Sequence, residues 1–238
     1  MSDAGAGNGS SGALRASLAA QLAELRGVAV ADLPASLLDV VVRRVELPGG
    51  DAFLVRPADW EALRHDEGAA GRPVPWWARL WPSGRALALT LAREPPAAGT
   101  RVLELGCGLA LPSLVAARAG AEVLATDGAT DAVAFAAHGI ALNAVQADVA
   151  HADWAVDADR LAAQAPWDLV LAADVFYARA NVDAAVRLLP RLVAARGEFL
   201  LADPGRTGTR DFLAAARHRF ELLTRRDGDV ALHTLRPR

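Results

Sequence analysis

The 238-residue sequence contains one cysteine, one methionine, one tyrosine and no lysine. The single cysteine, Cys107, excludes an intrachain disulfide and fits a reducing compartment. All 25 basic residues are therefore arginine, and alanine is abundant throughout. We attribute this pattern to GC-rich coding, so the arginine content by itself indicates no function.

Long apolar runs and a strong charge imbalance are also missing. No stretch reaches the roughly 18 to 20 residues of a membrane-spanning helix without charge or proline. The N-terminus lacks the basic and then apolar pattern of a secretory signal. The formal net charge of −3 creates no overall field that would favour nucleic acid or a membrane surface. We expect a monomeric cytoplasmic protein that acts on neither DNA nor membranes and holds no metal.

The remaining composition suits one domain with an accessory layer. A hydrophobic content of 53% is enough to bury a full core in a chain of this length. Residues 1–13 are mostly Gly, Ser and Ala and are predicted to be a disordered tail. Residues 14–72 are predicted to form an accessory segment, and residues 73–238 the main domain. The accessory elements are a helix over 14–25, a hairpin of 40–46 with 52–55, and a short helix over 59–66.

From residue 101 onward, short apolar runs alternate with amphipathic stretches, which indicates right-handed crossovers and a parallel sheet. The runs are RVLEL, EVLAT, ADVAH, WDLVLAAD and EFLLAD. Near the C-terminus, FELLTRR and DVALHTL flank Asp227-Gly228, a strong signal for a tight antiparallel hairpin. We therefore predict a Rossmann-like α/β fold: a seven-stranded, mostly parallel sheet with helices on both faces and an antiparallel C-terminal hairpin.

A glycine loop follows the first predicted parallel strand. Gly106 and Gly108 stand at its carboxyl end, where open α/β sheets bind ligands and glycine lets the backbone approach a bound molecule. Asp127 ends the next strand, where a carboxylate can accept hydrogen bonds from both ribose hydroxyls. Loop and acid together indicate an adenosine-type cofactor; the alternative is a tight turn with no ligand.

The residues around the loop favour one nucleotide over another. A dinucleotide fingerprint would need glycine at the position of Leu111. Glu104 is unfavourable beside a pyrophosphate but compatible with the ammonium and sulfonium charges of S-adenosylmethionine. This favours a methyltransferase over a nicotinamide-dependent dehydrogenase. Cys107 is interpreted as a space-filling residue whose backbone lies near the cofactor, rather than as a nucleophile.

Four segments carry a more specific likeness: PWWARLWPSGRAL (75–87), VLELGCG (102–108), DLVLAADVFY (168–177) and LLADPGR (200–206). In their order and spacing the chain, from about residue 73 to its end, resembles the seven-strand, class I methyltransferases. Among these it resembles the protein-lysine methyltransferases related to the electron-transfer flavoprotein β-subunit lysine methyltransferase. The resemblance implies S-adenosylmethionine as cofactor and a strand order of 3-2-1-4-5-7-6.

The resemblance also implies where the cofactor binds. Its residues are Trp81 over the cofactor, Glu104, Gly106, Cys107 and Gly108 around the methionine part, Asp127 on the ribose, and Asp153 and Trp154 at the adenine. Trp81 has a simpler interpretation as a core residue. Most acidic residues in HADWAVDADR are expected to be solvated surface.

The acceptor end is predicted beyond the fourth and fifth parallel strands. A lysine amine, with a pKa of about 10.4 in solution, must lose its proton before it can attack a methyl group. We expect Asp174 to anchor the incoming amine and Tyr177 to shape its site; the alternative is that Asp174 caps the next helix. Substrate contacts are predicted for Trp77, Phe176, Asp203 and Arg206. Trp77 could equally pack in the core, and Asp203 and Arg206 could equally hold each other.

The sequence thus predicts an N-methyltransferase acting on protein lysine, with the β-subunit of an electron-transfer flavoprotein as one candidate acceptor. Two alternatives stay open: methylation of a small-molecule amine, and a cofactor-binding interaction module without catalysis. The segment DPGR is not the Asn/Asp-Pro-Pro-Tyr/Phe motif used on exocyclic base amines, which argues against DNA and mildly against RNA as substrate.

Overall fold

The computed structural model describes the backbone of residues 6–238 and the side chains of residues 12–238. Its strands are β1 (Val40–Val45), β2 (Ala52–Pro57), β3 (Arg101–Leu105), β4 (Glu122–Asp127), β5 (Asp148–His151), β6 (Trp167–Ala173), β7 (Val193–Asp203), β8 (Phe220–Asp227) and β9 (Val230–Pro237). Its α-helices are α1 (Ala6–Arg26), α2 (Ala35–Leu38), α3 (Trp60–Ala69), α4 (Pro82–Arg93), α5 (Leu111–Arg118), α6 (Thr130–Leu142), α7 (Ala158–Ala162), α8 (Arg179–Leu192) and α9 (Thr207–Ala216).

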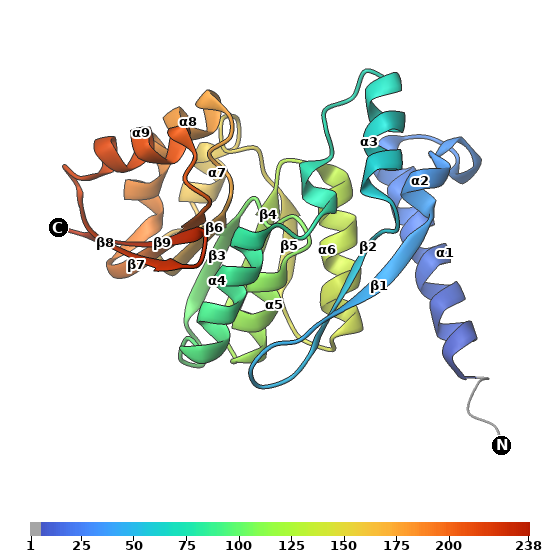
Figure 1. Ribbon diagram of the computed structural model, residues 1–238, viewed down its shortest axis with the longest axis horizontal. Helices are drawn as coiled ribbons and strands as arrows, with labels where there is room; N and C mark the ends of the chain where they lie inside the picture. Colours follow the sequence, from blue (N-terminus) through green and yellow to red (C-terminus); the bar gives the residue numbers. More distant parts are fainter. Residues whose placement is uncertain (1–5) are drawn as a thin grey trace.

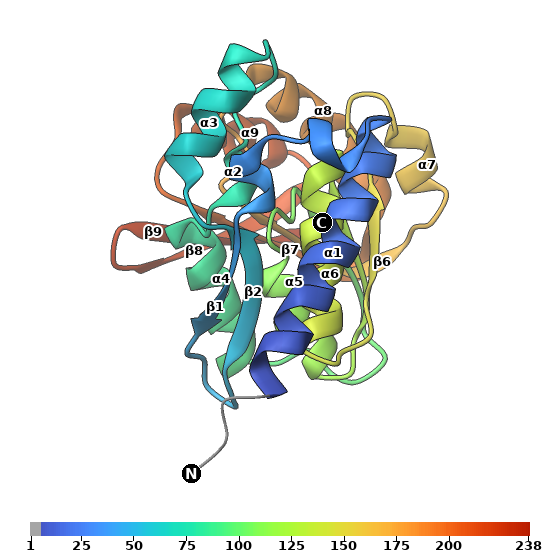
Figure 2. The same ribbon diagram turned by 90° about the vertical axis from the view of Figure 1, so that its right-hand side faces the viewer.

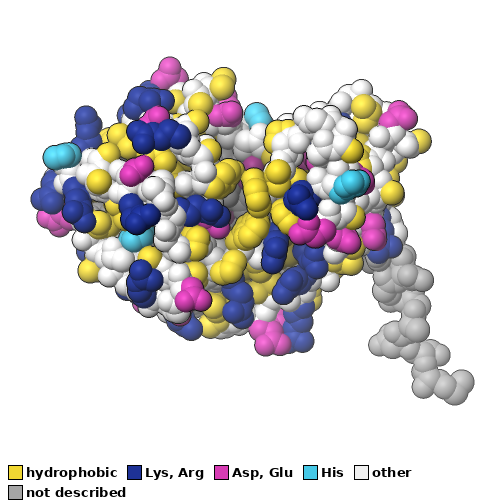
Figure 3. All heavy atoms as spheres, turned by 45° about the horizontal axis from the view of Figure 1, so that its top comes forward, with side chains coloured by type: hydrophobic (Ala, Val, Ile, Leu, Met, Phe, Trp, Pro, Cys, Tyr) yellow, Lys and Arg dark blue, Asp and Glu magenta, His cyan; other side chains and the backbone are white. Residues whose placement is uncertain are grey.

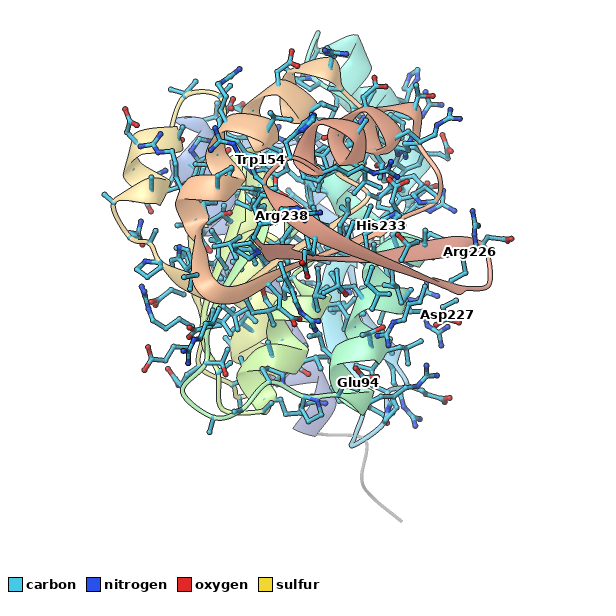
Figure 4. All side chains as sticks on the ribbon, turned by 90° about the vertical axis from the view of Figure 1, so that its left-hand side faces the viewer. Glu94, Trp154, Arg226, Asp227, His233 and Arg238 are labelled. Carbon is cyan, nitrogen blue, oxygen red and sulfur yellow. The ribbon has the colours of Figure 1, made fainter. Side chains whose placement is uncertain are left out.

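Seven strands form one sheet in the order β5-β4-β3-β6-β7-β9-β8. The neighbours from β5 to β7 are parallel, and β9 runs antiparallel to both β7 and β8. This is the predicted strand order, and the predicted fold class is confirmed. The C-terminal hairpin extends beyond the helices, with Arg226 and Asp227 at its tip (Figure 4).

Alternating side chains of the central strands face two cores. Val102 of β3 and Leu171 of β6 pack with α4, α5 and α6, whereas Leu103 of β3 and Val170 of β6 pack with α7, α8 and α9. A strand covered on both faces must be apolar throughout, which explains the continuous hydrophobic runs in the sequence. Figure 1 shows these helices on the two sides of the sheet.

The N-terminal elements form an additional layer against α6. β1 and β2 pair antiparallel, as the Pro-Gly-Gly sequence between them predicted, and α1 lies alongside α6 (Figure 2). Leu18 and Leu22 of α1 are buried in the same core as Phe135 of α6. α3 begins where the side chain of Asp59 accepts hydrogen bonds from the backbone N–H groups of the next turn, as a helix N-cap does.

Two boundaries differ from the prediction. α1 begins at Ala6, so residues 6–13, which the sequence assigned to a disordered tail, are helical, while residues 1–5 lie outside the described residues. Once Leu18 and Leu22 anchor the helix, adding further residues to it costs less free energy than forming its first turn did. β7 begins at Val193 instead of Glu198, because its first residues pair with the start of β6 across a register shift.

Within residues 6–238, none of the helices combines the length and the apolar character that crossing a membrane requires.

Candidate functional site

A cavity of about 820 Å³ lies at the carboxyl ends of β3, β4 and β6. This is the edge at which open α/β sheets bind their ligands, and the volume lies within the range usual for cofactor sites. The accessory layer supplies one wall of the cavity, through the end of α1 and the segment after α3. Figure 3 shows a hollow near the centre of the face that it draws, bordered by hydrophobic side chains.

The glycine loop forms the floor of the cavity. Gly106 has a φ of +67°, and a Cβ there would stand 2.9 Å from Cγ1 of Val175. Gly108 has a φ of +52°, and a Cβ there would stand 3.2 Å from the carbonyl oxygen of Trp77. Both the backbone conformation and the close neighbours therefore require glycine. Cys107, between them, is buried, and burial raises the pKa of its thiol, so it stays protonated and fills space.

Asp127 joins the loops that follow β3 and β4. Its Oδ2 accepts a hydrogen bond from the N–H of Gly108, and its Oδ1 accepts one from Ala129, each at 2.9 Å. Burial raises the pKa of this carboxyl. Because each carboxylate oxygen can accept a second hydrogen bond, Asp127 can hold a diol inside the cavity while still fixing both loops.

Glu104 lies beneath the loop with 1% of its surface exposed. Its Oε2 accepts hydrogen bonds from the backbone N–H of Ser113 at 2.9 Å and from the Ser113 hydroxyl at 2.5 Å. Burial raises the pKa of Glu104 to about 8. A positive group in the cavity would stabilise the ionised carboxylate, because the attraction is strong in a poorly solvated site.

Asp153 and Trp154 follow β5 and also line the cavity. Trp154 is 8% exposed, and its Cζ2 lies 3.6 Å from the position of a Cβ on Gly106, so the indole edge is next to the glycine loop. The carboxylate of Asp153 accepts a hydrogen bond from the N–H of Ala155 at 2.8 Å, which shapes the loop. An apolar ring beside an acidic residue suits a planar base that has an exocyclic amine.

The charges at the floor of the cavity fit S-adenosylmethionine better than a dinucleotide. Glu104 and Asp127 are both acidic, which opposes a pyrophosphate. Arg26 and Arg72 line the cavity too, but each is bound to Glu67. The donor set is therefore suited to ribose hydroxyls and to positive ammonium and sulfonium groups.

Asp174 and Tyr177, predicted from the sequence to lie at the acceptor end, both line the cavity. Asp174 has a φ of +58°, is 9% exposed and forms an ion pair with Arg206. It does not cap α8, whose N-cap residue is Ala178. Tyr177 is half-exposed beside Asp174 and Arg206, and partial burial raises the pKa of its hydroxyl.

Of the residues predicted to contact the substrate, the structure places one in the lining of the cavity and three outside it. Trp77 lines the cavity and also packs on Phe135, with ring centroids 5.0 Å apart. Phe176, Asp203 and Arg206 lie outside the lining of the cavity. Phe176 is buried and stacks on a phenylalanine of α9. Asp203 accepts hydrogen bonds from the backbone N–H groups of the residues after Pro204, and the Arg206 side chain bonds Asp174 instead of Asp203.

An aromatic wall borders the cavity mouth, and sequence reasoning found only part of it. It consists of Trp76, Trp81 and Tyr177, which line the cavity, and of Trp60, which packs against Trp76 and Trp81 outside the lining. Neighbouring ring centroids in it are 5.7 to 6.3 Å apart. The Trp81 ring N–H donates to the carbonyl oxygen of Trp76 at 2.8 Å, and the Arg79 guanidinium lies 5.0 Å above the Trp81 ring. Trp60 was missed because a tryptophan at a helix start is usually a core residue.

A buried ion network in the wall of the cavity was missed as well. Arg26 of α1 donates to Asp131 of α6 and, at 3.1 Å, to Glu67 of α3, which also accepts from Arg72 at 2.6 Å. Arg26, Glu67 and Asp131 side chains are at most 13% exposed. The members are far apart in sequence, so no local pattern could have indicated the network. It ties the accessory layer to the first turn of α6.

Comparisons with known proteins agree with this geometry. A family model described as lysine methyltransferase matches residues 77–218. The electron transfer flavoprotein beta subunit lysine methyltransferase of Danio rerio is 33% identical over 141 residues, 58% of this chain and 54% of that protein. The protein of the same name from Xenopus laevis is 36% identical over 137 residues, 56% of this chain and 53% of that protein. The chain thus spans about half the length of these curated relatives.

Solved structures share the fold at lower identity. The 16S rRNA N2 G1207 methyltransferase of T. thermophilus, in complex with AdoMet and guanosine, has a TM-score of 0.61 and 21% identity over 88% of this chain and 53% of that chain. A TehB-like SAM-dependent methyltransferase of Corynebacterium glutamicum has a TM-score of 0.54 and 19% identity over 75% of this chain and 96% of that chain. These two likenesses establish the class I methyltransferase fold.

Proposed function

The chain belongs to the lysine methyltransferase family, and from this we propose that it is an S-adenosylmethionine-dependent N-methyltransferase whose acceptor is the side-chain amine of a lysine in a protein. The observation that carries the proposal is that two carboxylates, for which we propose different roles, line the same cavity. Asp127 faces the glycine loop, and Asp174 stands at the acceptor end beside Tyr177. We further propose that residues 73–238 form the catalytic domain, in a cytoplasmic monomer.

The cofactor would be held by residues at the cavity floor. Asp127 would accept the ribose hydroxyls, Glu104 would face the ammonium group, and Trp154 with Asp153 would hold the adenine. Gly106 and Gly108 let the backbone approach the ligand closely. Trp81 lines the cavity as part of the aromatic wall and would lie over the cofactor.

When bound, S-adenosylmethionine supplies a methyl group that is already activated by its sulfonium. The protein therefore has to position the acceptor amine, exclude water and let a proton leave. Asp174 can accept a hydrogen bond from the amine and direct its lone pair toward the donor. Tyr177 and Trp76 limit the space around the amine, since their rings border the cavity mouth 6.3 Å apart.

Two curated relatives are named for the beta subunit of the electron transfer flavoprotein. We therefore propose this subunit as the first acceptor to test. The assay mixes the purified enzyme and methyl-labelled cofactor with recombinant β-subunit, and separately with a host lysate resolved by size. Label on a lysine of a protein is the expected result. Label only in small molecules, or no label in either sample, would reject the proposal.

Asp174→Asn tests the role of the acceptor carboxylate. Asparagine tolerates the left-handed backbone conformation of this site, so the fold is expected to persist. Transfer should fall by about 100-fold or more, as for loss of the group that orients the acceptor amine, while calorimetry with S-adenosylhomocysteine should give a nearly unchanged Kd. Asp183→Asn on α8, an aspartate paired with Arg179 on the surface, is the matched control and should keep full activity.

A further inference from the structure

The acceptor carboxylate already has a positive partner within the chain. The Arg206 Nε donates to Oδ1 of Asp174, whose side chain is 7% exposed. The Arg206 guanidinium also lies 5.9 Å from the centre of the Tyr177 ring. Arg206 is held in place from below, because Oδ1 of Asp203 accepts hydrogen bonds from the N–H groups of Gly205 and Arg206 at 2.6 and 2.7 Å. The ion pair therefore joins a buried carboxylate to an arginine whose backbone is fixed by Asp203.

An isolated carboxylate at this position would hinder the reaction proposed above. It would bind the charged ammonium of lysine and hold it in that form, since an opposite charge nearby favours ionisation. An ammonium has no lone pair and cannot attack a methyl group. A carboxylate that is already neutralised by a guanidinium can still accept a hydrogen bond at its second oxygen without the full attraction for a positive charge.

We propose that Arg206 is a positioning residue that neutralises Asp174, so that this carboxylate orients the acceptor amine without retaining it as ammonium. The inference rests on the proposed function and adds a residue to it. The acceptor ammonium releases its proton to solvent as it enters. The amine nitrogen then forms the new N–C bond, and the S–C bond breaks with its electron pair remaining on sulfur.

The charged groups around the pair agree with this role. The acidic neighbours of Arg206 are Asp174 at the end of β6 and Asp203 at the end of β7, and Tyr177 is its third titratable neighbour. Asp127 of β4 acts on Tyr177 from across the cavity, and His233 of β9 lies near Asp203. Among these neighbours, Arg206 supplies the permanent positive charge at the acceptor end.

Tyr177 provides a readout that needs no substrate. It is the sole tyrosine of the chain, so the near-ultraviolet absorbance of tyrosinate reports this one hydroxyl. Arg206 lowers the pKa of Tyr177, while Asp174 and Asp127 raise it. If Arg206 neutralises Asp174, its removal exposes Tyr177 to an uncompensated negative charge, and the titration midpoint must move to higher pH.

The experiment titrates Tyr177 in the ligand-free enzyme and in five variants, one of which is Arg206→Lys. Arg206→Gln should raise the midpoint by about one pH unit, the shift expected for one charge at this range in a half-solvated site. Asp174→Asn should lower it, and the double variant should return near the wild-type value. The matched control is Arg79→Gln, because Arg79 stacks on Trp81 and Trp60 instead of Tyr177. An unchanged midpoint in Arg206→Gln would overturn the inference.

Circular dichroism checks the fold of each variant. If Arg206→Gln does not fold, Asp174→Asn and Arg206→Lys still test the inference. Arg206→Lys keeps the positive charge and should keep the Tyr177 midpoint. Asp174→Asn must lower that midpoint.

A second arm measures methyl transfer to the recombinant β-subunit of the electron transfer flavoprotein across pH. Arg206→Gln should move the rising limb of the kcat profile, which reports deprotonation of the acceptor amine, to higher pH by about one unit. Arg206→Lys should restore the wild-type position of this limb. A uniform loss at every pH would show a merely structural role and overturn the inference. Absence of transfer by the wild type would reject the proposed function instead, while the Tyr177 titration would still test Arg206.

Discussion

Replacing Glu104 by Gln should change how the stability of the ligand-free protein depends on pH. Glu104 is fully buried beneath the glycine loop, and its pKa is raised from 4.5 to about 8. Above the pKa of the unfolded chain, unfolding lets this group ionise freely, whereas the folded protein keeps its proton until about pH 8. The folded state thus binds more protons than the unfolded state in this window, so its stability falls as pH rises.

The size of the stability change follows from the pH range in which the folded and unfolded states bind different numbers of protons. One proton of difference corresponds to about 1.4 kcal/mol per pH unit, so between about pH 5.5 and 7.5 the wild type should lose about 2.7 kcal/mol of stability to Glu104. The Gln variant has no such group. Its amide oxygen can still accept the hydrogen bonds from Ser113, which lie at 2.9 and 2.5 Å. The free energy of unfolding of the variant, relative to that of the wild type, should therefore increase by the same amount over this range.

The assay is urea unfolding of the ligand-free protein at a series of pH values, with Glu122→Gln as control. Glu122 is an exposed glutamate at the start of β4, so its variant should follow the wild-type profile. S-adenosylhomocysteine carries an ammonium group that would hold Glu104 ionised, and in its presence the wild-type slope should flatten. Parallel stability profiles for wild type and Glu104→Gln would refute the reasoning, since no buried proton would then be involved.

Three further substitutions test the walls of the cavity. Asp127→Ala should weaken cofactor binding measured by calorimetry about 30-fold or more, because it removes the acceptor for the ribose hydroxyls and frees both loops; an unchanged Kd would contradict this. Arg26→Met should cost about 3 kcal/mol in urea unfolding, because it leaves Asp131 as an unpaired buried carboxylate; a loss below 1 kcal/mol would contradict burial of the network. Trp76→Ala should raise KM for a protein acceptor about tenfold with little change in cofactor Kd; equal effects on both would place Trp76 on the cofactor.

Most of the fold could be predicted because each element carried its own local signal. The run RVLEL coincides with β3, and Asp227-Gly228 lies at the turn between β8 and β9. Strands buried on both faces are apolar throughout, and tight hairpins need particular turn residues, so both leave clear patterns. The beginning of α1 left none, because its N-terminal extension depends on the anchoring of Leu18 and Leu22 rather than on its own residues.

The proximity of the residues proposed to bind the cofactor could be predicted for a related reason. In a parallel sheet the carboxyl ends of neighbouring strands meet at one edge, so Gly106, Asp127 and Asp174 had to lie close together once their strands were known. Strand position does not determine which side chains pair at that edge. Arg26 reaches the cavity from the accessory layer, whose packing on α6 is a tertiary property with no fixed spacing in the sequence.

The pairing of Arg206 illustrates where that limit lies. From the sequence, Asp203 and Arg206 were equally able to hold each other or the substrate, because both follow β7 within one short turn. In the structure, Oδ1 of Asp203 accepts hydrogen bonds from the N–H groups of the turn, and the Arg206 side chain bonds Asp174 after β6 instead of Asp203. A motif of four residues thus acts on a carboxylate that is 32 residues away in sequence. The chemistry proposed for the acceptor end depends on that long-range contact, so a variant of either motif should be judged by its effect on the other.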